Sequence, residues 1–400
     1  MNNSRALPDW LDGFMQFTEN TEPPDRYRRW VGISTIAAVL QRKCFVRMGM
    51  ETFYPNLYIV LVGPPACRKG TAMKPGFLLL DRLGISLIAD NITREALVKR
   101  MGSINHTSID PLTGKPIMHA SVSIWSPEFA VFLGFRNQEF MSVLCDWYDC
   151  AKRWKYETKN SGSDEIIGVW VNLLGATTPK LLHTMMPSEA ISGGLTSRIV
   201  FVHEFAKGKT VIFPVHSDPE LNLFEDLAND LEKIHLLQGE FRYTEGWISL
   251  YSDWYRKSDS SPPILGDVRF DDYLGRRQVQ LIKLSQVLCA SRSDSMILTQ
   301  EDLSRAIAIL DDVEKNMGTV FSGMGKSDLA ELIPQVLGWL RTRGTSSLRD
   351  LMKNFYHDAD VQTMERVLRS LKIQGAVRMD HKQSGIDVTY ILGEEKGGQG

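Results

Sequence analysis

The segment between Leu57 and Thr71 carries the residue types that bind a nucleoside triphosphate. An apolar run ends at Gly63, and Lys69 follows at the start of a predicted helix. In such a turn backbone N–H groups cradle phosphates, a lysine meets their charge, a hydroxyl reaches Mg²⁺, and the helix N-terminus adds partial positive charge. We therefore expect ATP and Mg²⁺ to bind here. The contacting residues would be Gly63, Pro64, Pro65, Ala66, Cys67, Arg68, Lys69, Gly70 and Thr71, with Thr71 also reaching the metal.

Two positions of this turn depart from the usual pattern G-x-x-x-x-G-K-[ST]. Arg68 stands where the second glycine belongs, and Gly70 stands where the hydroxyl belongs, with Thr71 one residue later. Glycine lets backbone amides approach a phosphate closely, and arginine is less permissive. The alternative is an ordinary strand-to-helix turn with a chance Gly-Pro-Pro, although the long β-branched run before Gly63 favours a nucleotide site.

An acidic residue follows the predicted strand 119–125. An ATPase must hold magnesium and polarise an attacking water, usually with acids at the end of a neighbouring strand. Glu128 is the candidate for orienting and activating that water, and Ser126 is the candidate for the magnesium shell. Pro127 occupies the place of the aspartate in the usual Asp-Glu pair. The alternative is a surface glutamate after a core strand.

Two further side chains have the chemistry to meet a γ-phosphate. Thr178 lies at the tip of a predicted strand over 166–174, and Thr177 is the second choice there. Arg198 precedes an apolar strand, a position poorly suited to burial. At a subunit edge its guanidinium would neutralise transition-state charge on a neighbour's γ-phosphate. A common Thr-Thr-Pro turn and a surface salt bridge are the alternatives. In a predicted helix over 271–288, Arg276 or Arg277 would reach the nucleotide from a lid, or serve as surface residues.

A basic and aromatic segment over 152–163 is typical of a hairpin with a Gly/Ser tip. Basic groups meet phosphates and aromatic rings stack on bases, so the segment would grip single-stranded nucleic acid. The alternative is a solvated hairpin. Its basic residues are Lys152, Arg153, Lys155 and Lys159, which alternate with Trp154 and Tyr156.

Residues 328–393 show a compact pattern of three predicted helices and two strands. The helices cover 328–343, 348–356 and 361–374, and the strands 376–380 and 387–392, which is the pattern of a winged helix-turn-helix. Basic residues of the third helix and of the wing would face a DNA backbone. Docking of a protein is the alternative use of such a domain. The basic residues are Arg366, Arg369 and Lys372 on the helix, and Arg378, His381 and Lys382 on the wing.

The composition is that of a globular protein with room for two or three domains. The chain has 400 residues, 43% hydrophobic and 24% charged, and a formal net charge of −2. A broadly basic surface is thereby excluded, so any nucleic-acid site must be a local patch. Five cysteines without Cys-x-x-Cys spacing indicate reduced thiols, and Cys145 and Cys150 lack metal-knuckle spacing. No signal sequence or membrane span is evident, so we expect a cytoplasmic protein.

Strands and helices alternate along the middle of the chain, which predicts an α/β fold with a parallel sheet. We expect a helical N-terminal segment (1–47), a P-loop ATPase core (48–206), a helical lid and connecting region (207–325), a winged helix-turn-helix (326–393) and a disordered tail (394–400).

These elements, in this order, resemble the AAA+-type replicative helicase and ATPase domains encoded by bacteriophages and mobile elements, some of them fused to primases. The resemblance covers about residues 8–320, and the ordered set of motifs is far more specific than any one of them. The residues that carry it are Pro24-Asp-Arg-Tyr-Arg-Arg-Trp-Val31, Pro55-Asn-Leu-Tyr-Ile-Val-Leu-Val-Gly63 with Arg68-Lys69, Ser126-Pro-Glu128, Gly175-Ala-Thr-Thr-Pro179 and Gly193-Gly-Leu-Thr-Ser-Arg198.

The resemblance implies a role for each of these sites. Lys69 and Thr71 would bind phosphate and magnesium, Glu128 would be the Walker B glutamate, and Thr178 the sensor of the fourth strand. Arg198 would be an arginine finger acting across subunits. The family implies a homo-oligomeric ring, of the hexameric kind, with the 152–163 hairpin lining a pore around single-stranded DNA. Such a protein would work in the cytoplasm of a bacterial host.

The sequence therefore predicts an ATP-driven DNA helicase or translocase for replication of a phage or mobile element. Two rivals remain. The first is a non-unwinding ATPase that loads another helicase or remodels an origin complex. The second is a DNA-binding assembly protein whose nucleotide site is structural and hydrolyses nothing.

Overall fold

The chain divides into two compact units in the computed structural model. The structure describes residues 4–88, 92–109, 114–135, 137–158, 162–185, 194–215, 217–260, 271–320, 328–356, 359–373, 376–382 and 385–390. One unit spans Met1–Val320 and the other Phe321–Gly400. The predicted N-terminal helical segment, core and lid therefore belong to a single compact unit. The predicted tail and Lys159 lie outside the described residues.

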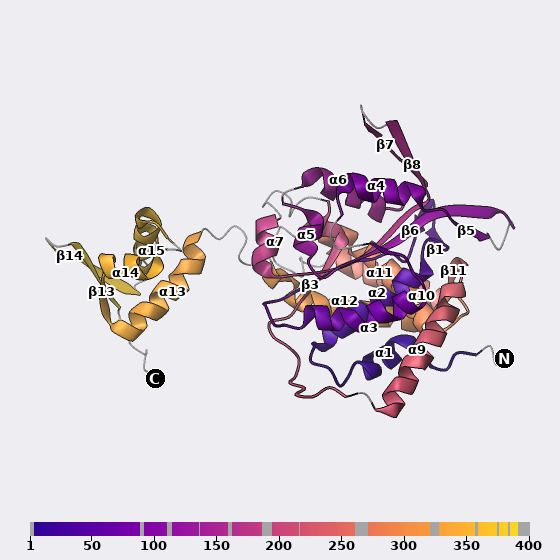
Figure 1. Ribbon diagram of the computed structural model, residues 1–400, viewed down its shortest axis with the longest axis horizontal. Coiled ribbons are helices and arrows are strands. Elements are labelled where there is room, and N and C mark those ends of the chain that lie inside the picture. The colour runs from indigo at the N-terminus through magenta and orange to yellow at the C-terminus, as the bar shows by residue number, and fades with distance from the viewer. Residues whose placement is uncertain are drawn as a thin grey trace. The chain divides into compact units, whose positions relative to one another are not determined.

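A five-stranded parallel sheet forms the centre of the first unit, as the alternation of strands and helices predicts (Figure 1). A short strand, β5 (His106–Ile109), extends it by pairing antiparallel with β6. Every residue of β3 and of β9 is buried. Burial on both faces is what a parallel sheet covered by helices requires. The sheet order is β10 (Ile199–His203), β3 (Tyr58–Val62), β9 (Val169–Thr177), β6 (Pro116–Ser126) and β4 (Leu87–Ile88).

Helices cover both faces of this sheet. Asn172 of β9 donates from its side-chain amide to the Ser34 carbonyl on α2 (Asp25–Leu40), at 3.2 Å. Tyr58, which pairs with the next residue of β9, donates its hydroxyl to the Leu144 carbonyl on α6 (Gln138–Tyr148), at 2.9 Å. Because successive strand residues point to opposite faces, α2 and α6 lie on opposite sides of the sheet, as Figure 1 shows.

Two of the remaining helices of this unit begin with ordinary capping residues. Asp9 caps α1 through its side chain, and Ser217 with Glu220 forms a capping box at α9. The remaining helices are α1 (Trp10–Phe17), α3 (Lys69–Arg82), α4 (Arg94–Ser103), α5 (Phe129–Leu133), α7 (Pro179–Met185), α9 (Asp218–Leu236), α10 (Glu245–Ser260), α11 (Asp271–Arg292) and α12 (Gln300–Val320), with a 3₁₀ turn at Thr196–Arg198.

A second small sheet corrects the expectation that helix continues to residue 47. Residues Cys44–Met48 form a strand, β1, which pairs in parallel with β11 (Gly239–Tyr243) and antiparallel with β2 (Glu51–Phe53). β12 (Ile297–Leu298) completes the sheet beside β11. Helix α2 ends at Leu40, and Gln41 adopts φ 53° just beyond it. The pairing of residues so distant in the sequence fixes these short strands.

An antiparallel hairpin leads into β9. β7 (Arg153–Thr158) pairs with β8 (Gly162–Ile167), which confirms a hairpin in the predicted place but extends it to residue 167. In Figure 1 this hairpin and the β5–β6 hairpin both project from the body of the first unit.

The second unit has three helices and a three-stranded antiparallel sheet. The helices are α13 (Asp328–Arg343), α14 (Leu348–Phe355) and α15 (Val361–Ile373). The strands are β13 (Thr345–Ser347), β15 (Gly385–Tyr390) and β14 (Val377–Lys382), in that sheet order. Its core is a separate apolar cluster that includes Leu340, Leu351, Leu368 and Val388, each fully buried. The sequence pattern predicts these helices to within a residue.

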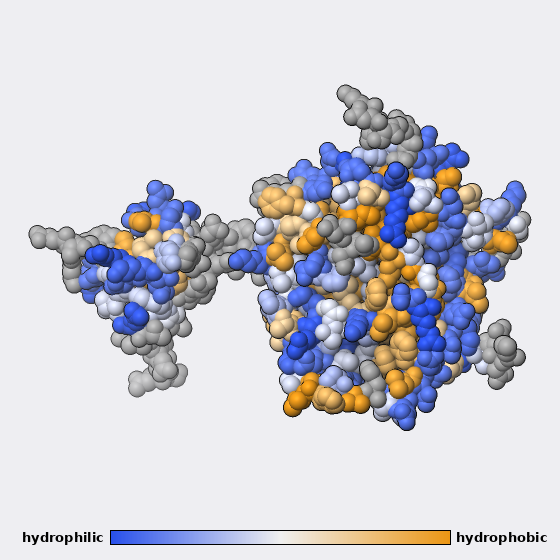
Figure 2. Space-filling view, viewed as in Figure 1, coloured by the Kyte–Doolittle hydropathy of each residue, from blue (hydrophilic) through white to orange (hydrophobic). Residues whose placement is uncertain are grey.

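The surface of the first unit mixes polar and apolar residues. Figure 2 shows hydrophobic residues between hydrophilic ones on the visible face of this unit. Within the described ranges, none of the helices has the length and hydropathy needed to cross a bilayer.

Candidate functional site

The carboxyl ends of three central strands meet at one edge of the parallel sheet. Val62 at the end of β3 pairs with Thr177 at the end of β9, and the Gly63 amide donates to the Thr177 carbonyl at 3.3 Å. Ser126 at the end of β6 pairs with Gly175 of β9. The turn over residues 63–71 (the predicted phosphate turn), Glu128 and Thr178 therefore follow three neighbouring strand ends. In open parallel sheets this is the edge at which ligands bind.

The turn before α3 achieves its shape without glycine at the critical position. Arg68 immediately precedes the helix and has φ 62° and ψ 29°, the left-handed region, and Ala66 has φ 66°. A side chain in this region costs about 1–2 kcal/mol of backbone strain. The Arg68 Nε donates to Glu22 Oε2 at 2.6 Å, which holds the side chain in place. The sequence predicts that arginine is unfavourable at this position. In the structure, an ion pair with a residue from a distant segment holds this arginine in place.

Glu22 is a site residue that sequence reasoning missed. Besides Arg68 it accepts a hydrogen bond from Lys207 Nζ at 2.7 Å. The Lys207 hydrogen bond and the two nearby cations hold the pKa of Glu22 below its usual range. No local motif marks this glutamate, because its partners lie 46 and 185 residues away along the chain.

Two glycines of the turn have opposite surroundings. A Cβ on Gly63 would lie 2.4 Å from the Tyr27 hydroxyl and 2.7 Å from the Glu204 carbonyl oxygen, so packing against protein excludes a side chain. Tyr27 donates that hydroxyl to the Val62 carbonyl at 2.6 Å and so fixes the end of β3. A Cβ on Gly70 would meet nothing within 4 Å. A side chain at Gly70, in the first turn of α3, would therefore project into open space.

Lys69 faces the turn from the first residue of α3. Its ammonium donates to the carbonyls of Gly63 at 2.7 Å and Pro64 at 2.9 Å. Burial lowers the pKa of Lys69, and the charges of Cys67 and Glu128 act in the opposite direction. Glu128 therefore lies within electrostatic range of the lysine, as a shared nucleotide site requires.

The hydroxyl and carboxylate candidates differ in exposure. Glu128 is exposed at the start of α5, and Thr71 is exposed in the first turn of α3. Thr178 is half-buried, and its hydroxyl accepts the Leu181 amide at 3.3 Å, which caps α7. Ser126 is 1% exposed, and its Oγ is buried without a hydrogen-bond partner among the described residues. The Thr71 hydroxyl is thus open to solvent, whereas the Ser126 hydroxyl is enclosed and has no hydrogen-bond partner among the described residues.

Arg198 stands directly before β10, as the sequence predicts, but it is buried. Its side chain is 8% exposed, and Nη2 pairs with Asp149 Oδ2 at 2.5 Å. The expectation that this position is poorly suited to burial is therefore wrong, because Asp149 neutralises the guanidinium. Arg198 immediately precedes the amino end of β10. The first residue of β10, Ile199, pairs with Tyr58 at the start of β3. Arg198 is thus at the sheet edge opposite the phosphate turn.

The structure separates Arg276 and Arg277, the two arginines predicted to reach the nucleotide from a lid. Arg277 is buried and pairs with Glu314 at 2.7 Å and with Asp311, so it is part of the packing between α11 and α12. Arg276 has a side chain that is 34% exposed and pairs with Asp149 at 3.3 Å. It therefore joins Arg198 rather than the phosphate turn.

The two faces of the β7–β8 hairpin have different surroundings. Lys152, Arg153 and Lys155 are exposed. Trp154 and Tyr156 stack on each other and contact the body of the unit, through Trp147 on α6 and Arg94 on α4. The rings predicted to stack on bases are thus engaged by protein. On the other face Arg153 pairs with Glu165 at 3.5 Å, and its side chain stays largely exposed.

Helix α15 presents a basic face. Arg366, Arg369 and Lys372 are exposed, while Val367, Leu368 and Leu371 of the same helix are buried. On β14, Arg378 is exposed and pairs with Asp380 at 3.4 Å. The side chains of His381 and Lys382 lie outside the described set.

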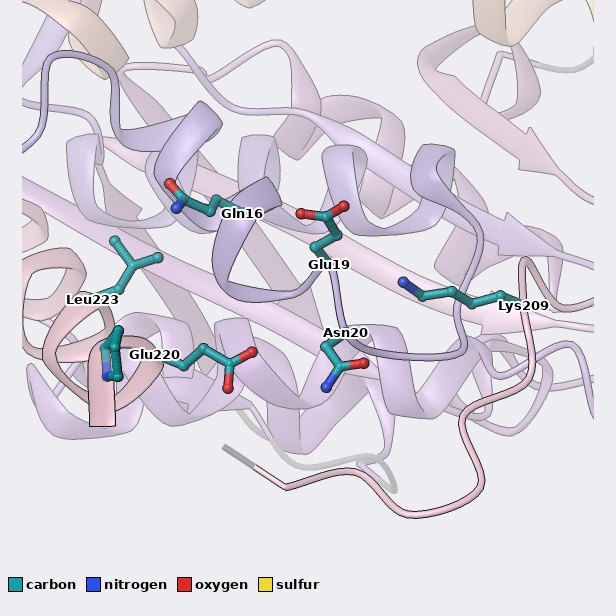
Figure 3. A pocket seen from close by; sticks show the side chains of 7 residues that line it. Gln16, Glu19, Asn20, Lys209, Glu220 and Leu223 are labelled. Carbon is teal, nitrogen blue, oxygen red and sulfur yellow. The ribbon is translucent and has the colours of Figure 1, made fainter. Parts of the chain in front are cut away.

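A polar hollow of about 350 Å³ lies elsewhere, between the end of α1 and the start of α9 (Figure 3). Lys209 extends toward Glu19 and Asn20 there, opposite Glu220. None of the predicted site residues lines this hollow. Those that follow the ends of β3, β6 and β9 lie at the sheet edge, which is therefore the candidate site. Within the described residues no group of three or more His, Cys, Asp and Glu suits a metal, and all five cysteines are free thiols.

The comparisons with known proteins leave the family open, since no protein-family model and no curated protein matches the sequence.

Proposed function

We propose that this protein is an ATP-hydrolysing, ring-forming DNA translocase of the AAA+ type, acting as a helicase in phage or mobile-element replication. The observation that carries the proposal is the convergence at the sheet edge. Lys69, Glu128 and Thr178 come from three segments and follow adjacent strand ends, in front of a helix N-terminus with open space beside Gly70. This arrangement supports a P-loop nucleotide site.

Each residue has a role that follows from its place. The ammonium of Lys69, now bound to two carbonyls of the turn, exchanges these acceptors for phosphate oxygens. Arg68, held by Glu22, adds a second positive charge beside it. Thr71 would hold a Mg²⁺ ion, which would neutralise charge on the phosphates. Glu128 orients the attacking water, and Thr178 contacts the γ-phosphate from the end of β9.

Two basic surfaces provide for DNA. Exposed Arg153 and Lys155 on the hairpin suit the phosphates of a single strand in a pore. The three helices and the three-stranded antiparallel sheet of the second unit support a winged helix-turn-helix, in which the basic face of α15 would contact duplex DNA.

A phosphate-release assay with and without single-stranded DNA tests the proposal. We expect DNA-stimulated turnover in the natural chain and none in Lys69→Ala. Lys74→Ala, on the exposed side of the same helix, is the matched control and should retain turnover. Equal turnover in Lys69→Ala and Lys74→Ala would refute the nucleotide site. Strand displacement on forked DNA then separates a helicase from an ATPase that loads another helicase.

A DNA-binding assembly protein with a structural nucleotide is the second candidate. The two carbonyl bonds of Lys69 and the replacement of glycine by Arg68 favour it, because both oppose rapid exchange of phosphates at the turn. It predicts that ATP raises the unfolding midpoint while no phosphate is released, with or without DNA.

A further inference from the structure

A histidine on α7 holds the last residue of α12. His183 Nε2 lies 2.8 Å from the Val320 carbonyl oxygen, and because a carbonyl only accepts, the ring nitrogen carries the hydrogen and donates it. Val320 is fully buried, ends α12 and is the last residue of the first unit. The last four carbonyls of a helix have no partner inside the helix, so a donor from another element stabilises this end.

The C-terminal part of α12 lies beside the candidate site. Asn316 Nδ2 donates to the carbonyl of His203, the last residue of β10, at 3.4 Å. His203 pairs with Val62, which directly precedes the phosphate turn. The bond from His183 adds a contact from the segment that follows β9. The end of α12 is therefore connected to two of the strand ends that form the candidate site.

Helix α7 joins His183 to the predicted sensor of the terminal phosphate. The helix begins at Pro179, directly after Thr178, whose hydroxyl accepts the Leu181 amide at 3.3 Å and whose carbonyl accepts the Leu182 amide at 3.0 Å. Thr178 is thereby bonded to the first turn of the helix that carries His183. About five residues of helix, roughly 7.5 Å at 1.5 Å per residue, separate the two side chains. A shift of Thr178 therefore displaces His183 as well.

The hydroxyl of Thr178 can serve the helix and a phosphate together. A hydroxyl oxygen accepts while its hydrogen is donated, so Thr178 can keep the Leu181 amide and donate to a phosphate oxygen. Hydrogen bonds chained in this way polarise and strengthen one another. A terminal phosphate thus adds an anchor at the start of α7, and removal of that phosphate takes the anchor away.

We propose that His183 is a positioning residue that reports the terminal phosphate of a bound nucleoside triphosphate to the end of α12. With a triphosphate bound, Thr178 anchors α7 and His183 holds the Val320 carbonyl. With a diphosphate bound, this anchor is missing and the last turn of α12 opens more often. The nucleotide thereby controls the residue at which the first unit ends. This inference rests on the proposed nucleotide site.

Hydrogen exchange of the full chain, measured on the amides of the last turn of α12 (residues 317–320), tests this inference. One hydrogen bond is worth about a 2- to 10-fold change in an opening equilibrium, so exchange should be slower by about this factor with a saturating non-hydrolysable ATP analogue than with ADP. In His183→Ala the two nucleotides should give the same rate, with analogue binding unchanged. Thr184→Ala, exposed on the same helix, is the matched control and should keep the difference.

The outcomes separate this inference from the proposed function. No analogue binding by the natural chain in equilibrium dialysis overturns both. Analogue binding with equal exchange rates for the two nucleotides, or a difference that survives in His183→Ala, overturns the role of His183 alone.

A second variant covers a loss of stability. If His183→Ala unfolds at lower urea than the natural chain, Thr178→Val decides, because it removes the hydroxyl and leaves His183 and Val320 in place. At an analogue concentration that saturates this variant, the analogue and ADP should give equal exchange rates. A difference that persists there overturns the inference.

Discussion

Replacing Arg68 by glycine and by alanine separates the two reasons for which this position matters. The backbone there has φ 62°, and the side chain, 43% exposed, pairs with Glu22. Both variants lose the ion pair, which at this exposure contributes about 0–1 kcal/mol. Only glycine relieves the left-handed strain of about 1–2 kcal/mol. Glycine also raises the conformational entropy of the unfolded chain, which costs about 0.4–1 kcal/mol of stability. Arg68→Gly should therefore be more stable than Arg68→Ala by about 0.5–1 kcal/mol.

Urea unfolding with and without nucleotide measures both effects. At a nucleotide concentration about 100 times its dissociation constant, binding adds about 2.7 kcal/mol of stability. If the turn needs only the positive φ, Arg68→Gly keeps this increment. If the guanidinium binds phosphate, both variants lose part of it at the same nucleotide concentration.

Equal stability of the glycine and alanine variants of Arg68 would refute the argument from backbone strain. Arg68→Ala as stable as Arg68→Gly would show that the left-handed backbone is not what the position has to accommodate. Glu22→Gln provides the control, since it removes the charge of the partner and leaves the backbone of the turn as it is.

Four further changes test other parts of the molecule. Tyr27→Phe should lower the free energy of unfolding in urea by only about 1 kcal/mol, because the carbonyl at the end of β3 keeps a backbone donor at 3.0 Å; a loss above about 3 kcal/mol would contradict this. Burial lowers the pKa of Lys283 from 10.5 to about 8, so the folded state releases this proton first as the pH rises. The stability of the natural chain relative to Lys283→Met should thus increase from pH 7 to pH 10 by about 2–3 kcal/mol, whereas a constant difference would disprove the shift. Arg198→Ala should abolish DNA-stimulated phosphate release and leave nucleotide binding nearly intact; equal loss of binding would end its assignment to a neighbour's phosphate. The double change Arg366→Ala with Arg369→Ala should reduce the slope of log K against log salt for duplex DNA by about 2, and an unchanged slope would remove α15 from the DNA interface.

Local patterns were sufficient for the order of the main elements. The apolar run of β3, the alternation of strands and helices, and the amphipathic helices of the second unit each bury a face that the sequence marks at short range. The same holds for Lys69, Glu128 and Thr178, because each follows a strand, and parallel strands place their carboxyl ends at one edge. Short strands such as β1 were not predictable, since their partner β11 lies almost 200 residues further along the chain.

By itself the sequence determined the parallel sheet and the residues that end its strands, because both depend on hydrophobic periodicity within a few positions. Only the tertiary structure decided which charges meet. Glu22 forms an ion pair with Arg68, 46 residues further along the chain. Asp149 forms one with Arg198, 49 residues further along. The energy of an ion pair depends on distance and burial in space, and neither is encoded in sequence separation.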